Sequence, residues 1–167
     1  MLYLGIDPGA KGGLACINDK DEVFALRGMP ETLREIWEWF KTFEKMECFA
    51  VLEQVSGYIG KSKNKDGAKG NTGKSMFTFG QSYGSLEMAL VACSFQKDRG
   101  YWTILPQRWQ RGLGLKKSKE VIAEGKDWKT YLKEEAHRRF PKIKTTLKTG
   151  DALLIAQYCK ILAKRNL

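Results

Sequence analysis

Three acidic residues stand where apolar segments of the chain begin or end. Asp7 ends the first apolar segment, Glu53 ends the run CFAVL, and Asp151 opens the run ALLIAQYCKILA. A carboxylate at the end of a buried element is costly unless another group pairs with it. Carboxylate oxygens are hard ligands, and a pair of divalent cations held by such acids can drive a phosphoryl displacement. The three acids therefore predict a Mg²⁺ site in which Mn²⁺ can substitute.

Each acid also has a structural explanation when it is taken alone. Asp7 could hold a turn with Gly9, and Glu53 could be a surface acid at the end of a strand. Asp151 follows Gly150 and could cap the helix that it opens. The metal site is favoured because all three acids lie where apolar structure meets a loop.

The other potential ligands exclude a familiar zinc cluster. The chain has one histidine, His137, and no CxxC pair. The four cysteines lie in apolar segments and no secretory signal opens the chain, which together predict reduced, buried thiols in a cytoplasmic protein. They are Cys16, Cys48, Cys93 and Cys159.

The charge of the chain favours a polyanionic partner. Lys and Arg number 29 against 19 Asp and Glu, which gives a net charge of +10. Such an excess can simply be a solvated surface, but it also attracts phosphates. No run reaches the ~20 apolar residues that span a bilayer, so nucleic acid is favoured over membrane. The length of 167 residues predicts one domain, 1–167.

Basic residues interleaved with aromatic ones form two segments that suit a DNA backbone. Tyr58 is the better candidate for a wedge between bases, whereas Trp109 is the better candidate for the core. The segment 68–75 matches a relaxed phosphate-loop pattern, but no strand precedes it, so we expect a basic DNA-contacting loop and no nucleotide cofactor. The predicted DNA-binding residues are Tyr58, Lys61, Lys63, Lys65, Lys74, Ser75, Arg108, Arg111, Lys116, Lys117 and Lys119.

The elements that must position these residues are strands first, then helices and strands mixed, which predicts an α/β sheet with a mixed edge. Asp7 and Glu53 end two strands that we expect to be neighbours, so their carboxylates can approach. The predicted strands are 2–7, 12–18, 22–27, 48–53 and 102–105. The predicted helices follow Pro30, begin near Ser75 and at Pro106, and span about 127–139 and 151–164.

Five segments in the same order resemble the RuvC family of Holliday-junction resolvases, within the RNase H and retroviral-integrase superfamily. They are LGIDPGAKGGLA, VLEQVSGYIG, SMFTFGQSYGSLEMAL, LPQRWQRGLGLKKSKE and KTGDALLIAQY, and they cover nearly the whole chain. Glu-Gln-Val followed by the GQxxG step is the most specific part. The resemblance implies an RNase H-like fold, with a mixed five-stranded sheet and helices on both faces.

The resemblance also implies an activity and an assembly. It implies a Mg²⁺-dependent endonuclease that resolves four-way junctions in branched DNA by paired nicks that leave 5′-phosphates. Asp7 would bridge the metals, and Glu53 and Asp151 would complete the site. A four-way junction has two-fold symmetry, so a homodimer is expected. The helix carrying Gly80 and Gly84 is the candidate interface, and the small size fits a phage or viral relative.

One position departs from the family pattern. The family usually has a fourth metal-site residue three positions before the last acid, and here that position is Lys148. A protonated lysine cannot ligate a metal, but it could neutralise a phosphate or orient the attacking water, or it could be an ordinary solvated lysine. Two alternative functions stay open: an RNase H-type nuclease on RNA–DNA hybrids, and a non-catalytic protein that binds DNA junctions. A third is a nucleotide-binding protein, because LGIDPGAKGG also resembles the first phosphate loop of the actin and sugar-kinase ATPases, but that fold needs two such domains and this chain is too short.

Overall fold

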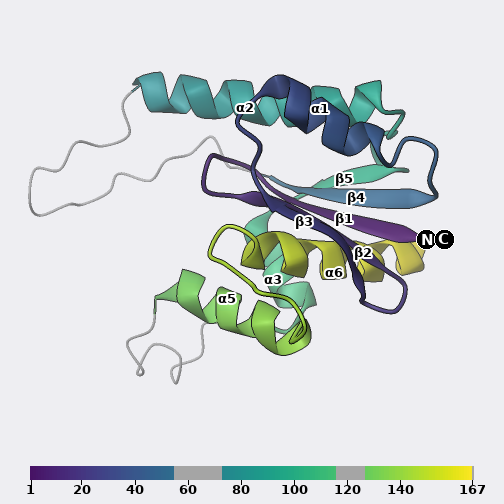
Figure 1. The fold of residues 1–167 in the computed structure, drawn as a ribbon, viewed down its shortest axis with the longest axis vertical. Helices are drawn as coiled ribbons and strands as arrows, with labels where there is room; N and C mark the ends of the chain where they lie inside the picture. The colour runs from purple at the N-terminus through teal and green to yellow at the C-terminus, as the bar shows by residue number, and fades with distance from the viewer. Residues whose placement is uncertain (55–72, 116–126, 167) are drawn as a thin grey trace, which may run out of the picture.

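A mixed five-stranded sheet forms the centre of the fold, with helices on both faces (Figure 1). The computed structural model describes residues 1–54, 73–115 and 127–166. The strands lie in the order β3-β2-β1-β4-β5. They are β1 (Leu2–Asp7), β2 (Gly13–Asn18), β3 (Val23–Gly28), β4 (Cys48–Glu53) and β5 (Tyr101–Ile104). The predicted strands and the predicted fold class are thus confirmed, with bounds within one residue.

The first three strands form an antiparallel meander, and the last two extend the sheet in parallel from β1. β1 pairs antiparallel with β2 and β2 pairs antiparallel with β3, whereas β4 runs parallel to both β1 and β5. The carboxyl ends of β1, β4 and β5 therefore lie at the same edge of the sheet. This edge receives the ends of the two strands that carry predicted ligands.

The helices divide into two layers. The helices α1 and α2 cover one face of the sheet, and α3, α5 and α6 cover the other (Figure 1). Their bounds are α1 (Leu33–Lys41), α2 (Gly73–Ala92), α3 (Pro106–Gly112), α5 (Trp128–Arg139) and α6 (Gly150–Asn166). None of the helices in the described ranges is long and apolar enough to cross a membrane.

Alternating side chains of the inner strands fill a separate core on each face. In β1, Tyr3 packs with the core under α6, whereas Leu4 and Ile6 pack with the core under α1 and α2. Successive side chains of a strand point to opposite faces, so a strand covered on both sides is apolar throughout. This explains why β1 and β4 read as continuous apolar runs rather than alternating ones.

The helix α6 lies directly against β1 at Gly5. A Cβ atom built on Gly5 would come within 2.1 Å of the Ala152 carbonyl oxygen and within 2.2 Å of the Ala156 nitrogen. Both neighbours are backbone atoms, which cannot rotate away as the end of a side chain can. The absence of a side chain at residue 5 therefore allows the helix to approach the strand this closely.

We predict that Gly5→Ala strongly destabilises the protein, because the new methyl group must displace the backbone of α6. The expected loss is more than about 3 kcal/mol in the free energy of unfolding, measured by urea denaturation. Gly28→Ala is the matched control, since its Cβ would only reach ordinary contact, 3.4 Å from Cδ of Lys148. A Gly5→Ala variant as stable as Gly28→Ala would contradict the packing of α6 on β1.

Candidate active site

Two of the three predicted acids end adjacent parallel strands. The register of β1 on β4 pairs Leu2 with Cys48 and continues to Ile6 with Leu52, so Asp7 and Glu53 are the next residues on each strand. Parallel strands bring these ends to one edge of the sheet. The backbone register therefore places two carboxyl groups side by side at that edge.

The third acid reaches this edge from α6. Asp151 lies in the first turn of the helix, and the next residue, Ala152, packs against Gly5. A carboxylate in the first turn interacts favourably with the helix dipole. The close approach of α6 to β1 thus positions Asp151 near the end of the strand that carries Asp7.

Asp7 is the most unusual of the three acids. It is 6% exposed, and its Oδ2 atom is buried with no hydrogen-bond partner among the described residues. Burial raises the pKa of Asp7 to about 8, and the negative charges of Glu53 and Asp151 add to that rise. A buried, unpartnered carboxylate oxygen is rare in a folded protein and suits a ligand to a cation.

Burial also raises the pKa values of the other two acids. The pKa of Glu53 rises to about 7, because burial and the charge of Asp151 outweigh a hydrogen bond that favours the ionised form. The pKa of Asp151 rises through burial as well. All three carboxyl groups are therefore held in surroundings that disfavour negative charge unless a cation is close.

The hydrogen bond to Glu53 comes from Trp109, which the sequence analysis placed in the core. The indole of Trp109 is fully buried, and its Nε1–H donates to Oε2 of Glu53 across 2.7 Å. Its helix, α3, begins two residues after β5, the strand that pairs with β4. Trp109 thus fixes the orientation of one carboxyl oxygen, a role that sequence reasoning missed.

A lysine that the sequence analysis did not single out contributes positive charge to the site. Nζ of Lys129, near the start of α5, lies 3.8 Å from Oδ2 of Asp151. Its charge lowers the pKa of Asp7, Glu53 and Asp151 and so opposes the effect of burial on each. The Lys129 side chain remains 54% exposed, so it can move away from the site.

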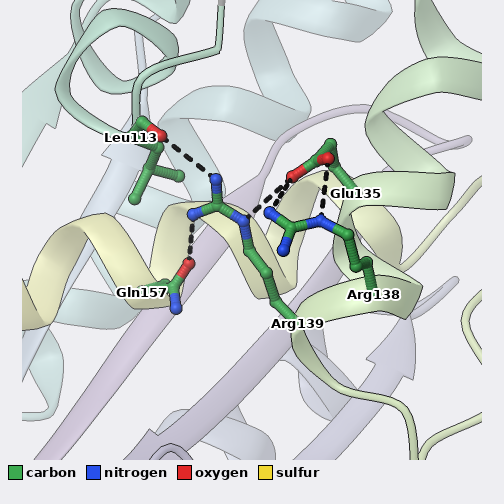
Figure 2. Close-up of polar contacts among 5 residues, drawn as sticks. All are labelled: Leu113, Glu135, Arg138, Arg139 and Gln157. Carbon is green, nitrogen blue, oxygen red and sulfur yellow. Dashed lines mark hydrogen bonds and ion pairs between the residues drawn. The ribbon is translucent and has the colours of Figure 1, made fainter.

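The helix that carries Lys129 is held in place by Arg139. Its guanidinium donates to Glu135 within α5, to Oε1 of Gln157 on α6 and to the carbonyl oxygen of Leu113 after α3 (Figure 2). Arg138 pairs with the same Glu135 carboxylate. One side chain thereby joins three segments and fixes α5 beside the helix that carries Asp151.

Lys148 lies in the turn just before α6 and is exposed. Its aliphatic stem passes Gly28 of β3, and its carbonyl oxygen lies against Gly13 of β2. The structure therefore places Lys148 beside the strand that follows Asp7. Its predicted catalytic role stays a prediction.

The three carboxyl groups are ligands of the kind that a hard divalent cation prefers, but they do not surround a single position. Among the described residues, no three side chains of His, Cys, Asp or Glu are grouped closely enough to hold one ion as they stand. Asp7, Glu53 and Asp151 nevertheless lie within one another's electrostatic influence. The unpartnered Oδ2 of Asp7 makes this donor set fit Mg²⁺ or Mn²⁺.

Most of the predicted DNA-binding residues lie outside the described ones. Of the predicted set, Arg108 and Arg111 are described, and both are exposed on α3. The predicted residues that the structure leaves out are Tyr58, Lys61, Lys63, Lys65, Lys116, Lys117 and Lys119, together with the side chains of Lys74 and Ser75.

Comparison with solved structures supports the architecture. The chain superposes on a structure of RuvC from Thermus thermophilus with a TM-score of 0.61 and 14% sequence identity, covering 99% of this chain and 97% of that one. No protein-family model matches the sequence, and no curated protein matches it. The likeness establishes a RuvC-like fold. At this identity it carries no activity over to the chain.

We predict that the protein without divalent metal loses stability as pH rises. Asp7 has a pKa of about 8 in the folded state against 3.8 unperturbed, so between these values the folded state binds more protons than the unfolded state. The free energy of unfolding should therefore fall between about pH 4 and pH 8, by about 5 kcal/mol. Urea denaturation in EDTA at several pH values measures it.

Asp7→Asn should flatten this pH dependence and make the metal-free protein more stable than wild type at pH 8. Asp98→Asn is the control, because it makes the same change at an exposed turn. Equal slopes for wild type and Asp7→Asn would show that Asp7 is not held in a costly ionised state.

Proposed function

We propose that the protein is a Mg²⁺-dependent endonuclease that nicks branched DNA, with the four-way junction as its substrate. The observation that carries the proposal is the buried Oδ2 of Asp7, which has no partner among the described residues and lies with Glu53 and Asp151 at one edge of the sheet. The RuvC-like fold and the net charge of +10 support it.

Asp7, Glu53 and Asp151 are the residues that would hold the metal. When bound, Mg²⁺ or Mn²⁺ would activate a water and stabilise the leaving 3′ oxygen, so that each nick leaves a 5′-phosphate. The raised pKa values of the three carboxyl groups mean that cation binding competes with protonation near neutral pH. Trp109 keeps Glu53 oriented through its 2.7 Å hydrogen bond.

Lysine charge beside the acids would help a phosphodiester to enter. Lys129 is near enough to Asp151 to neutralise part of the acidic site and exposed enough to turn toward a phosphate. Lys148 is a second candidate for this role, from the turn before α6. The predicted basic residues in segments 58–75 and 108–119 would contact the DNA backbone.

The same proposal includes a homodimer formed through α2. Phe77, Met88 and Val91 are 67%, 62% and 53% exposed. Their spacing places them in one stripe with Gly80 and Gly84, where an added Cβ would meet no atom within 4 Å. A second copy would cover this apolar stripe, because a four-way junction presents two equivalent strands to a two-fold symmetric protein.

We predict that Asp7→Asn reduces nicking of a four-way junction by at least about 1,000-fold in Mg²⁺, because it removes a metal ligand. Binding of the junction should be kept or strengthened, since a charge that repels phosphate is lost. Gel assays of cleavage with fluorescence anisotropy of binding measure both effects, with Asp98→Asn as the control.

The same assay separates the alternatives when junction, RNA–DNA hybrid and linear duplex are tested in parallel. Preference for the hybrid would favour the RNase H-type nuclease. Junction binding without nicking by the wild type in Mg²⁺ or Mn²⁺ would favour the non-catalytic binder. Near wild-type cutting by Asp7→Asn would refute the assigned site.

We predict that the double change Phe77→Gln and Met88→Gln raises the dissociation constant of the dimer about tenfold or more, because it removes exposed apolar side chains from the interface. Analytical ultracentrifugation measures it. Phe24→Gln is the matched control, since Phe24 is a comparably exposed residue (56%) on β3. A monomeric wild type, or an equal effect of Phe24→Gln, would exclude α2 as the interface.

A further inference from the structure

A basic groove lies between α3 and the C-terminal half of α6, away from the three acids. It has a volume of about 710 Å³. Its lining combines a short apolar floor with three arginines and two amides. The lining residues are Leu105, Gln107, Arg108, Arg111, Gly112, Tyr158, Leu162, Arg165 and Asn166.

The charged side chains that line the groove, within the part of the chain that the structure describes, are all arginines. They are Arg108, Arg111 and Arg165, and no aspartate or glutamate is among the described residues of the lining. None of the three forms an ion pair with another described residue, whereas Arg34 and Arg138 pair with glutamates within their own helices. Three guanidinium groups around one concavity suit phosphate groups, which each guanidinium can bind with two parallel hydrogen bonds.

The helix α3 carries residues of both the candidate active site and the groove. Trp109 points inward to Glu53, and Arg108 and Arg111 on the same helix line the groove. At its far end the groove reaches Arg165, fourteen residues beyond Asp151 on α6, which is about 21 Å along the helix axis. That span equals about six base pairs of duplex at ~3.4 Å per pair.

We propose that this groove binds the phosphate backbone of a DNA arm, with Arg165 contacting it about six base pairs from the nicked phosphodiester. The proposal rests on the nuclease function proposed above and extends it, because it assigns a second contact on the same arm. A duplex that is bound both at the acids and at the groove has a fixed direction relative to the acids. The groove would thus contribute affinity only when the arm is long enough to reach it.

The test compares Arg165→Gln with wild type on two four-way junctions, one with arms of about 12 base pairs and one with hairpin-closed arms of about 4. Fluorescence anisotropy in EDTA measures binding without catalysis. Arg165→Gln should weaken binding of the long-armed junction about threefold to tenfold, and it should lower the salt dependence of that binding by about one phosphate contact. The loss on the short-armed junction should be much smaller.

Arg34→Gln is the matched control, because it removes an exposed arginine from α1, on the opposite face of the sheet. Equal losses of affinity for Arg34→Gln and Arg165→Gln, or equal losses on the long-armed and short-armed junctions, would overturn the proposed role of the groove. Such a result leaves the nuclease proposal standing, because that proposal is tested by metal-dependent nicking. Conversely, Arg165→Gln could weaken binding of the long-armed junction alone in a protein that never nicks DNA. That result would support DNA binding by the groove and refute the nuclease proposal. No junction binding at all would overturn both.

Discussion

The arrangement of the site depends on the contact between α6 and β1 at Gly5. Any side chain at that position would overlap the backbone of the helix, with Ala152 and Ala156 nearest. Because the helix lies on the strand without an intervening side chain, the first turn of α6 reaches the edge of the sheet where β1 and β4 end. Asp7, Glu53 and Asp151, which are far apart in the sequence, share one region of space as a result of this packing.

That convergence is unfavourable in the absence of a cation. Burial raises the pKa values of all three carboxyl groups, neighbouring negative charges add to the rise for Asp7 and Glu53, and one oxygen of Asp7 has no partner among the described residues. Among the described residues, the Trp109 indole on Glu53 and the Lys129 ammonium near Asp151 offset part of this cost, and the dipole of α6 favours the charge on Asp151. The two hydrophobic cores on either side of the sheet supply the stability that offsets the unfavourable free energy of these buried carboxyl groups. Residues kept in so costly a state point to function rather than to folding.

The elements were predictable from the sequence because their signals are local. Apolar runs bounded by an acid or by glycine gave the strands, and the parallel register of β1 and β4 made Asp7 and Glu53 neighbours. Lys129 was not predictable in this way. Its approach to Asp151 depends on the packing of α5 beside α6, which Arg139 fixes by reaching Gln157 and the Leu113 carbonyl (Figure 2). The burial of Trp109 could be anticipated, but its hydrogen bond to Glu53 is a tertiary contact.

The short helix α3 shows how one element can serve two regions of a small protein. Its seven residues carry Trp109 on the inner face, and Arg108 and Arg111 on the outer face. Because Trp109 is fully buried and bonded to Glu53, the helix cannot shift without disturbing that carboxylate. The arginines are therefore held at a fixed position relative to the acids. A DNA backbone bound by these arginines would therefore have a fixed position relative to the acids, because α3 joins the two contacts without a flexible segment between them.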